Sequence, residues 1–243
     1  MKLFGLIGYP LSHSFSKKYF TDKFQQEGID DSRYELFPIE KIDDISSLLD
    51  ENLDLTGLNV TIPYKEQVIP YLHELSPAVQ SIGACNCIHV VNGRLVGYNT
   101  DVIGFQKTLE PQLREHHTKA LVLGTGGAAK AVHHVLKLKG IEYIEVSRSA
   151  RGEVISYDQI DEELMCSHTL IINTTPLGMY PHVDAAPNIP YAFLGRQHYL
   201  YDLVYNPNPT LFLKNGIDKG ATVENGSEML RIQAEESWKI WNA

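Results

Sequence analysis

The chain has 243 residues, of which 43% are hydrophobic and 21% charged, which is typical of a soluble globular protein and argues against a disordered or fibrous one. At about 150 residues per domain, this length predicts one large or two modest domains. The formal net charge of −9 disfavours nucleic acid and anionic membranes as partners, because an acidic field repels polyanions.

The first predicted element is a buried strand over 3–8, an apolar run that ends at Tyr9-Pro10. With one positive charge and an apolar stretch broken by Gly and Pro, this start favours a strand over a signal peptide. No apolar run approaches the roughly 18 residues that a transmembrane helix needs. We therefore expect a cytoplasmic protein.

Helix-like and strand-like patterns then alternate through the first half of the chain. The predicted helices span 14–27, 42–49 and 76–82, and the predicted strands span 34–39, 57–62, 87–91 and 94–98. The last two strands flank Asn92-Gly93, a signal for a type I′ turn, so we expect them to form a hairpin.

A fresh alternation begins in the second half. Strands are predicted over 119–123, 143–146, 169–173 and 198–203, and helices over 131–139, 209–219 and 228–241. Repeated βα units of this kind predict parallel sheets. We expect an α/β fold of two domains, with the boundary in a helix over 102–114.

The three cysteines do not indicate a metal site. Cys85 and Cys87 lie two residues apart, and Cys166 stands alone, without the further ligands at regular spacing that zinc requires. A chain of this size also does not depend on a disulfide framework.

A glycine-rich turn joins the strand over 119–123 to the helix that follows. Gly124-x-Gly126-x-x-Ala129 fits the turn that lets the backbone approach a pyrophosphate at a helix N-terminus. The alternative is an ordinary βα turn built from small residues. The flanking strand and helix favour the dinucleotide interpretation.

The end of the next strand indicates which dinucleotide. An acidic residue there suits the ribose hydroxyl of NAD, whereas an arginine suits the 2′-phosphate of NADP. Glu145 comes too early, while Arg148 and Arg151 follow Ser147, so we expect NADP. The alternative is two solvated surface arginines.

Three segments in the first half carry more polar residues than their strand ends need. In Ser12-His13-Ser14-Phe15-Ser16, hydroxyls alternate ahead of a helix, which suits a carboxylate, although capping by one serine is the alternative. In Asn59-Val60-Thr61-Ile62-Pro63-Tyr64-Lys65, the lysine follows a strand end and is suited to polarise a carbonyl or relay a proton, although a surface lysine is the alternative.

The third segment is Asn99-Thr100-Asp101, with Asn86 upstream. An aspartate that opens a helix is most often an N-cap. Sequence spacing alone does not show whether Asp101 pairs with Lys65.

Together these segments resemble the shikimate dehydrogenase family, from residue 4 to about 240 and in the same order. The matching motifs are Gly8-Tyr9-Pro10 with His13-Ser14-Phe15-Ser16, Asn59-Val60-Thr61-Ile62-Pro63-Tyr64-Lys65, Gly83-Ala84-Cys85-Asn86, Asn99-Thr100-Asp101, Gly124-Thr125-Gly126-Gly127-Ala128, Asn173-Thr174-Thr175-Pro176-Leu177-Gly178, Tyr201-Asp202-Leu203-Val204-Tyr205, and Gly226 with Gln233.

The resemblance implies an N-terminal α/β substrate-binding domain over 1–101 and a Rossmann-type NADP-binding domain over 102–225. It also implies that a C-terminal helix within 226–243 returns to the first domain. The expected reaction is the NADPH-dependent reduction of 3-dehydroshikimate to shikimate, in the pathway to aromatic amino acids. The small-molecule substrate is the expected partner, and the oligomeric state stays open.

The resemblance also assigns site residues. Lys65 and Asp101 form the implied catalytic pair. The implied substrate-binding residues are Ser14 and Ser16 for the carboxylate, with Asn59, Thr61, Asn86, Tyr205 and Gln233. The implied cofactor-binding residues are Gly124, Gly126, Gly127, Ala128, Ser147, Arg148, Arg151, Thr174, Val204 and Gly226.

The chain departs from the family pattern at two notable places. Lys17 stands where the family usually has Pro, and Glu228 stands where Gly is common. Two other functions stay open: a dehydrogenase that accepts quinate or uses NAD, and a non-catalytic ligand-binding relative. Retention of Lys65 and Asp101 argues against the non-catalytic relative.

Overall fold

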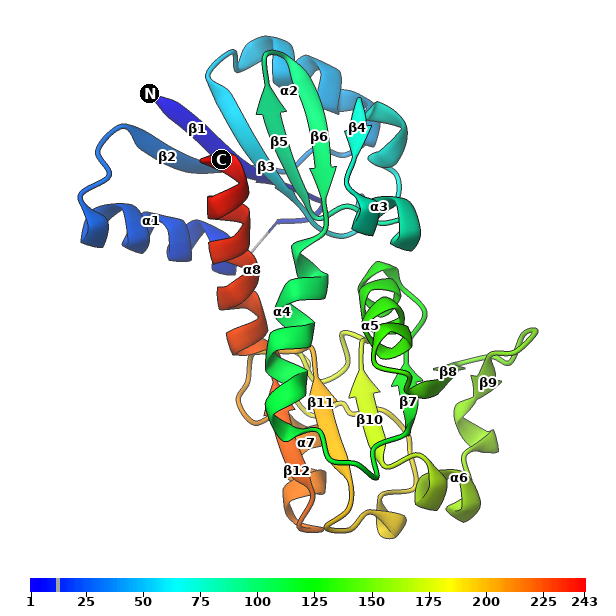
Figure 1. The fold of residues 1–243 in the computed structure, drawn as a ribbon. Helices are drawn as coiled ribbons and strands as arrows, with labels where there is room; N and C mark the ends of the chain where they lie inside the picture. The colour runs from blue at the N-terminus through cyan, green and yellow to red at the C-terminus, as the bar shows by residue number, and fades with distance from the viewer. Residues whose placement is uncertain (12–13) are drawn as a thin grey trace. The chain divides into compact units, whose positions relative to one another are not determined.

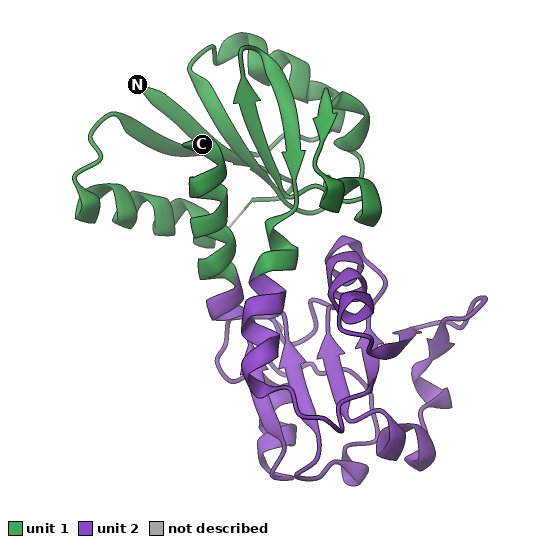
Figure 2. Cartoon of the chain, in the orientation of Figure 1, with its two compact units in different colours: residues 1–103, 230–243 green, residues 104–229 purple. Residues whose placement is uncertain are grey.

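The computed structural model describes residues 1–11 and 14–243. It divides into two compact units, unit 1 with residues 1–103 and 230–243, and unit 2 with residues 104–229 (Figure 2). One boundary falls within helix α4 (Thr100–Leu109) and the other within helix α8 (Gly226–Trp241). Within the described ranges, no helix combines the length and the apolar composition that a membrane span requires.

Unit 1 is built on a mixed six-stranded sheet in the order β2-β1-β3-β5-β6-β4 (Figure 1). β1, β2 and β3 are parallel, and β5 pairs antiparallel with β3 and with β6. The strand bounds are β1 Lys2–Ile7, β2 Ser32–Phe37, β3 Leu55–Val60, β4 Glu74–Leu75, β5 Cys87–Val91 and β6 Arg94–Tyr98. The predicted hairpin is confirmed, with positive φ angles at both Asn92 and Gly93, as a type I′ turn requires.

Helices cover both faces of this sheet because β1 alternates its apolar side chains. Phe4 and Leu6 pack with α1 and α8 in one core, whereas Leu3 and Ile7 pack with α2 in another. The helix bounds are α1 Phe15–Glu27, α2 Ile45–Glu51 and α3 Pro77–Ile82, with short 3₁₀ turns at Ile42–Asp44 and Ile69–Tyr71. α8 therefore completes the core of unit 1.

Unit 2 has a six-stranded sheet in the order β12-β11-β10-β7-β8-β9, parallel throughout, as the alternating pattern predicts. Its strands are β7 Lys119–Leu123, β8 Glu142–Ser147, β9 Ile155–Ser156, β10 Leu170–Asn173, β11 Tyr199–Asp202 and β12 Thr222–Asn225. Its helices are α5 Gly127–Leu138, α6 Glu162–Ser167 and α7 Leu211–Ile217, with 3₁₀ turns at Glu110–Gln112, Tyr157–Gln159 and Tyr191–Phe193. This strand order is that of a dinucleotide-binding fold, and the order reverses between β7 and β10.

Several predicted bounds are wrong for local reasons. The helix expected over 102–114 begins at Thr100 and gives way at Glu110 to a 3₁₀ turn, because Pro111 lacks the N–H that would continue the helix. The helix expected from 131 begins at Gly127, directly in the glycine turn. The sequence prediction also missed β4, β9, β12 and α6, which are short and carry little hydrophobic periodicity.

Candidate active site

Polar residues of unit 1 gather at the carboxyl ends of β1 and β3. These strands are parallel neighbours, and the segments that follow them pack into the two different cores of unit 1. Folds of this kind bind ligands at such strand ends. Ser14 follows β1, and Thr61 and Lys65 follow β3.

Lys65 and Asp101 form an ion pair. Lys65 Nζ donates to Asp101 Oδ2 at 2.7 Å, although 36 residues separate the two in sequence. The lysine side chain is 16% exposed and the aspartate side chain 3% exposed. A charge-assisted hydrogen bond with so little solvent contact fixes the direction of the ammonium group.

Backbone and amide contacts hold this pair in place. The Cys85 N–H donates to the Lys65 carbonyl at 2.7 Å, which ties down the loop after β3. Asp101 is the second residue of α4, and the Asn99 side chain accepts from the Val102 N–H at 3.3 Å. The capping alternative for Asp101 is therefore wrong, because Asn99 takes that role and leaves the aspartate to Lys65.

Asn86 anchors the same helix. Its Oδ1 accepts from the Thr100 N–H at 2.6 Å, and its Nδ2 donates to the Thr100 hydroxyl at 3.0 Å. The residue is 4% exposed. The structure thus gives Asn86 a positioning role that sequence reasoning missed, and a direct substrate contact stays a prediction.

Asn59 lies in a buried polar network. Its Oδ1 accepts from the Tyr34 hydroxyl, and its Nδ2 donates to the Ser237 hydroxyl, both at 2.9 Å. By contrast, within residues 1–11 and 14–243 the side chains of Thr61 and Gln233 make no hydrogen bond. Those two half-buried groups remain available to a ligand.

Ser14 caps α1, because its hydroxyl accepts from the Lys17 N–H at 3.2 Å. The capping alternative is thus present, and it does not exclude a further contact from the same hydroxyl. Lys17 pairs with Glu35 at 2.8 Å on β2. Ser12 and His13 of the same motif lie outside the described residues.

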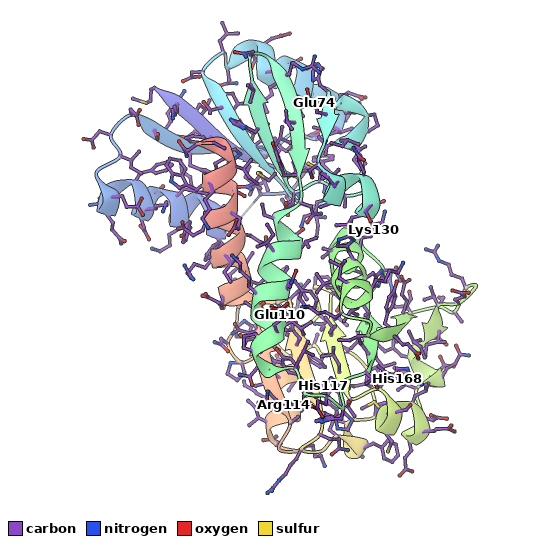
Figure 3. The ribbon with its side chains drawn as sticks, in the orientation of Figure 1. Glu74, Glu110, Arg114, His117, Lys130 and His168 are labelled. Atoms are coloured by element: carbon purple, nitrogen blue, oxygen red, sulfur yellow. The ribbon has the colours of Figure 1, made fainter. Side chains whose placement is uncertain are left out.

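The glycine turn of unit 2 is shaped by close contacts on one side and open space on the other. Gly124 has φ +110°, and a Cβ there would meet Thr174 Oγ1 at 2.6 Å. Gly126 is the N-cap of α5, and a Cβ there would meet nothing within 4 Å. The open side gives a ligand access to the first N–H groups of α5, whose first turn also carries Lys130 (Figure 3). This cradle fits a pyrophosphate.

The remaining residues predicted to bind the cofactor surround this turn or follow nearby strands. Thr174 donates its hydroxyl to the Leu123 carbonyl at 2.8 Å, so it braces the turn. Gly226 opens α8, and a Cβ there would collide with the Leu203 carbonyl oxygen. Arg148 and Arg151 are exposed just beyond Ser147, the last residue of β8. Gly127 and Ala128 are the first two residues of α5, and Val204 lies in the turn after β11. Tyr205, predicted to bind the substrate, follows Val204 in the same turn.

A buried carboxyl group, missed by sequence reasoning, organises the turns after β10 and β11. Asp202 accepts from Asn173 Nδ2 at 2.9 Å, from the Val204 N–H at 3.0 Å and from the Thr210 hydroxyl at 2.6 Å. Burial raises the pKa of Asp202 to about 6, although these hydrogen bonds work in the opposite direction. No group of His, Cys, Asp and Glu side chains in the described part of the chain is arranged to hold a metal.

Comparisons with known proteins relate the whole chain to one enzyme family. A family model described as the shikimate dehydrogenase substrate binding domain matches residues 6–88. The NADP(+) shikimate dehydrogenase of Clostridium beijerinckii is 40% identical over 253 residues, covering 99% of this chain and 92% of the relative. The chain belongs to the shikimate dehydrogenase family.

Solved structures of this family and of a related enzyme share the fold. The Thermus thermophilus shikimate 5-dehydrogenase, in complex with NADP(H) and shikimate, is 30% identical, with a TM-score of 0.86 and coverage of 99% of this chain and 93% of the other. The quinate dehydrogenase of Corynebacterium glutamicum, in complex with NAD, is 26% identical, with a TM-score of 0.86 and the same coverage of both chains. The predicted two-domain α/β fold of Rossmann type is thereby confirmed.

Proposed function

We propose that this protein is an NADP-dependent shikimate dehydrogenase that reduces 3-dehydroshikimate to shikimate. The observation that carries the proposal is the largely buried Lys65–Asp101 ion pair at the strand ends of unit 1, in a chain of this family. Residues 1–101 with 226–243 would bind the substrate, and residues 102–225 would bind the cofactor.

NADPH supplies the hydride for the reduction of the substrate carbonyl. Lys65 Nζ then delivers a proton to the carbonyl oxygen as that oxygen gains negative charge. Asp101 accepts one of the three ammonium hydrogens of Lys65. This contact fixes the directions of the other two, which are left to donate to the substrate. Aiming requires a fixed carboxylate, which the anchored start of α4 provides.

The substrate carboxylate is assigned to the hydroxyls of Ser14 and Ser16, and the ring hydroxyls to side chains at the ends of β3 and α8. Thr61 and Gln233 support this assignment, because their side-chain polar groups have no hydrogen-bond partner in the described chain. Asn59, Asn86 and Tyr205 complete the proposed set.

The cofactor pyrophosphate is assigned to the open side of the glycine turn at Gly126. Arg148 would hold the 2′-phosphate, because it is exposed at the end of β8, where a Rossmann fold meets the adenosine ribose. The positive charge of this arginine would attract the phosphate locally, although the chain as a whole carries a negative net charge.

A second candidate function is a quinate dehydrogenase that uses NAD. The similarity to the Corynebacterium glutamicum enzyme favours testing it. The cytoplasmic location and the absence of nucleic-acid and membrane partners stay predictions from the sequence.

A cofactor-oxidation assay tests the proposal. The purified protein should oxidise NADPH when 3-dehydroshikimate is added, and it should reduce NADP with shikimate more efficiently than it reduces NAD with quinate. Preference for quinate and NAD would favour the second candidate, and activity with neither pair would leave a ligand-binding relative.

A further inference from the structure

All but one of the hydrogen-bonding positions of Asn59 are taken by protein groups. Its Oδ1 accepts from Tyr34, and its two Nδ2 hydrogens point to the Ser237 hydroxyl at 2.9 Å and to the Asn86 carbonyl oxygen at 3.4 Å. An amide offers two donors and two acceptor lone pairs. One lone pair on Oδ1 is therefore left for a ligand.

The protein also fixes which way the amide points. In the opposite orientation, Oδ1 of Asn59 would face the carbonyl oxygen of Asn86, and two acceptors would meet. Tyr34 is 2% exposed and Ser237 is 0% exposed, so water does not compete for these contacts. Burial raises the pKa of Tyr34, which keeps its hydroxyl a donor, while the neighbouring Ser16 hydroxyl acts in the opposite sense.

The contact between Ser237 and Asn59 also fixes the position of α8 along the direction of β3. The Trp241 ring fills the space beside Gly57, and one helical turn earlier Ser237 contacts Asn59. Four residues of a helix advance about 6 Å and two residues of a strand about 6.6 Å. Every fourth residue of α8 therefore stays opposite every second residue of β3. By the same spacing we expect Gln233, one turn earlier in α8, to lie opposite Thr61, just beyond the strand end.

We propose that Tyr34 and Ser237 are positioning residues of the substrate site. Together they hold Asn59 so that it meets the substrate only as a hydrogen-bond acceptor, which selects a hydroxyl rather than a carbonyl or carboxylate oxygen at that position. Ser237 also keeps Gln233 opposite Thr61, through the position of α8 along β3. This inference rests on the proposed function, because it takes Asn59 and Gln233 as substrate-binding residues.

Steady-state kinetics on two conservative variants test the proposal. Tyr34→Phe and Ser237→Ala each remove one hydroxyl and keep the packing, including the ring stack of Tyr34 on Phe20. Each should raise the KM for 3-dehydroshikimate by about 5- to 30-fold, the range for one lost hydrogen bond that orients a binding group. The kcat should stay within about 3-fold, and the KM for NADPH should not change.

A double-mutant cycle separates positioning from general destabilisation. In an Asn59→Ala background, Ser237→Ala should change the substrate KM by less than about 2-fold, because its effect acts through the missing amide. Tyr34→Phe should lose most of its effect there, apart from what it causes through the neighbouring Ser16 hydroxyl. Tyr191→Phe, which loses a tyrosine hydroxyl bonded to the Pro187 carbonyl in unit 2, is the matched control and should leave the substrate KM unchanged. Unchanged KM values for Tyr34→Phe and Ser237→Ala, or full effects in the Asn59→Ala background, would overturn the proposal.

A readout without substrate distinguishes this inference from the proposed function. The two side-chain N–H signals of Asn59, assigned by their loss in Asn59→Ala, should shift in NMR spectra of Tyr34→Phe and Ser237→Ala but not of Tyr191→Phe. Signals that stay in place would overturn the network. An inactive wild-type protein whose signals shift as expected would instead refute the dehydrogenase function and the substrate role assigned to Asn59.

Discussion

Cys85 and Asn86, adjacent in sequence, hold the two halves of the Lys65–Asp101 pair. The Cys85 N–H binds the lysine backbone at 2.7 Å, and the Asn86 side chain binds the Thr100 N–H at 2.6 Å at the start of the helix that carries the aspartate. The loop after β3 and the start of α4 are therefore positioned by one dipeptide. The distance between the ammonium and carboxylate groups is set by this shared support.

Replacing Lys65 with methionine should remove the proton donor and keep the length of the side chain. We expect kcat for 3-dehydroshikimate reduction to fall by about 10²- to 10⁴-fold, with a smaller rise in KM, because the ammonium binds the developing charge more strongly than the ground state. The measurement is kcat and KM at saturating NADPH. Lys18→Met, at an 80% exposed side chain, is the control. A normal kcat with only a raised KM would make Lys65 a binding residue.

Replacing Asp101 with asparagine should lower kcat and also raise the substrate KM, because the carboxylate both aims Lys65 and is expected to contact a hydroxyl. If the two residues act as one unit, Lys65→Met with Asp101→Asn should lose much less activity than the product of the single losses. The same kinetic assay on the double variant decides this. Multiplicative losses would show that the two side chains act independently.

Replacing Arg148 with alanine should weaken NADPH binding and leave NADH binding nearly unchanged. A charge-assisted contact of about 1.5–3 kcal/mol corresponds to about a 10- to 150-fold loss of affinity. Dissociation constants for both cofactors, measured by titration, test this. Arg33→Ala, a surface arginine of unit 1 paired with Asp54, serves as the control. Equal losses for both cofactors would remove the 2′-phosphate role.

Two glycines in unit 2 should respond differently to the same substitution. Gly226→Ala forces a methyl group against the Leu203 carbonyl and should destabilise the protein by about 1–3 kcal/mol. Gly126→Ala adds a methyl group into open space at an ordinary φ of −84°, so the free energy of unfolding should stay near wild type. Its effect should appear in NADPH affinity, because the methyl group obstructs the approach to α5. Denaturant unfolding and cofactor titration of both variants test the contrast.

Asp202 should make the protein less stable as pH rises from about 4 to about 6. Its folded pKa is raised to about 6 from an ordinary value of 3.8, so in this window the unfolded chain has already lost the proton that the folded chain keeps. The free energy of unfolding must then fall with pH, by up to about 3 kcal/mol for this group.

Asp202→Asn should remove that slope, whatever its effect on absolute stability through the hydrogen bonds of the site. Denaturant unfolding of both proteins at several pH values gives the difference. Histidines such as His117, whose pKa burial lowers, contribute the opposite slope in both proteins and cancel in the comparison. Parallel curves for the two proteins would contradict the assignment.

The sequence predicts most of the fold because the relevant signals are local. The Asn92-Gly93 turn and the glycine-rich segment before α5 each act within a few residues. The partners of Asn59 could not be found in this way, because Tyr34 lies 25 residues away and Ser237 lies 178 residues away. Contacts at such separations depend on the packing of whole elements. The polar strand β12 was missed for a similar reason, since its position is set by pairing with β11.

The return of α8 to unit 1 has a consequence for how the chain emerges from the ribosome. Residues 104–229 form a continuous stretch, so unit 2 can fold while the last part of unit 1 is still to be made. Trp241, 2% exposed and bonded to the Ile88 carbonyl at 2.9 Å, joins the aromatic core around Phe4 only after that. Until then α1 alone covers that face of the sheet, and the apolar surface that α8 later buries is exposed in the nascent chain, as is typical of chains that bind chaperones.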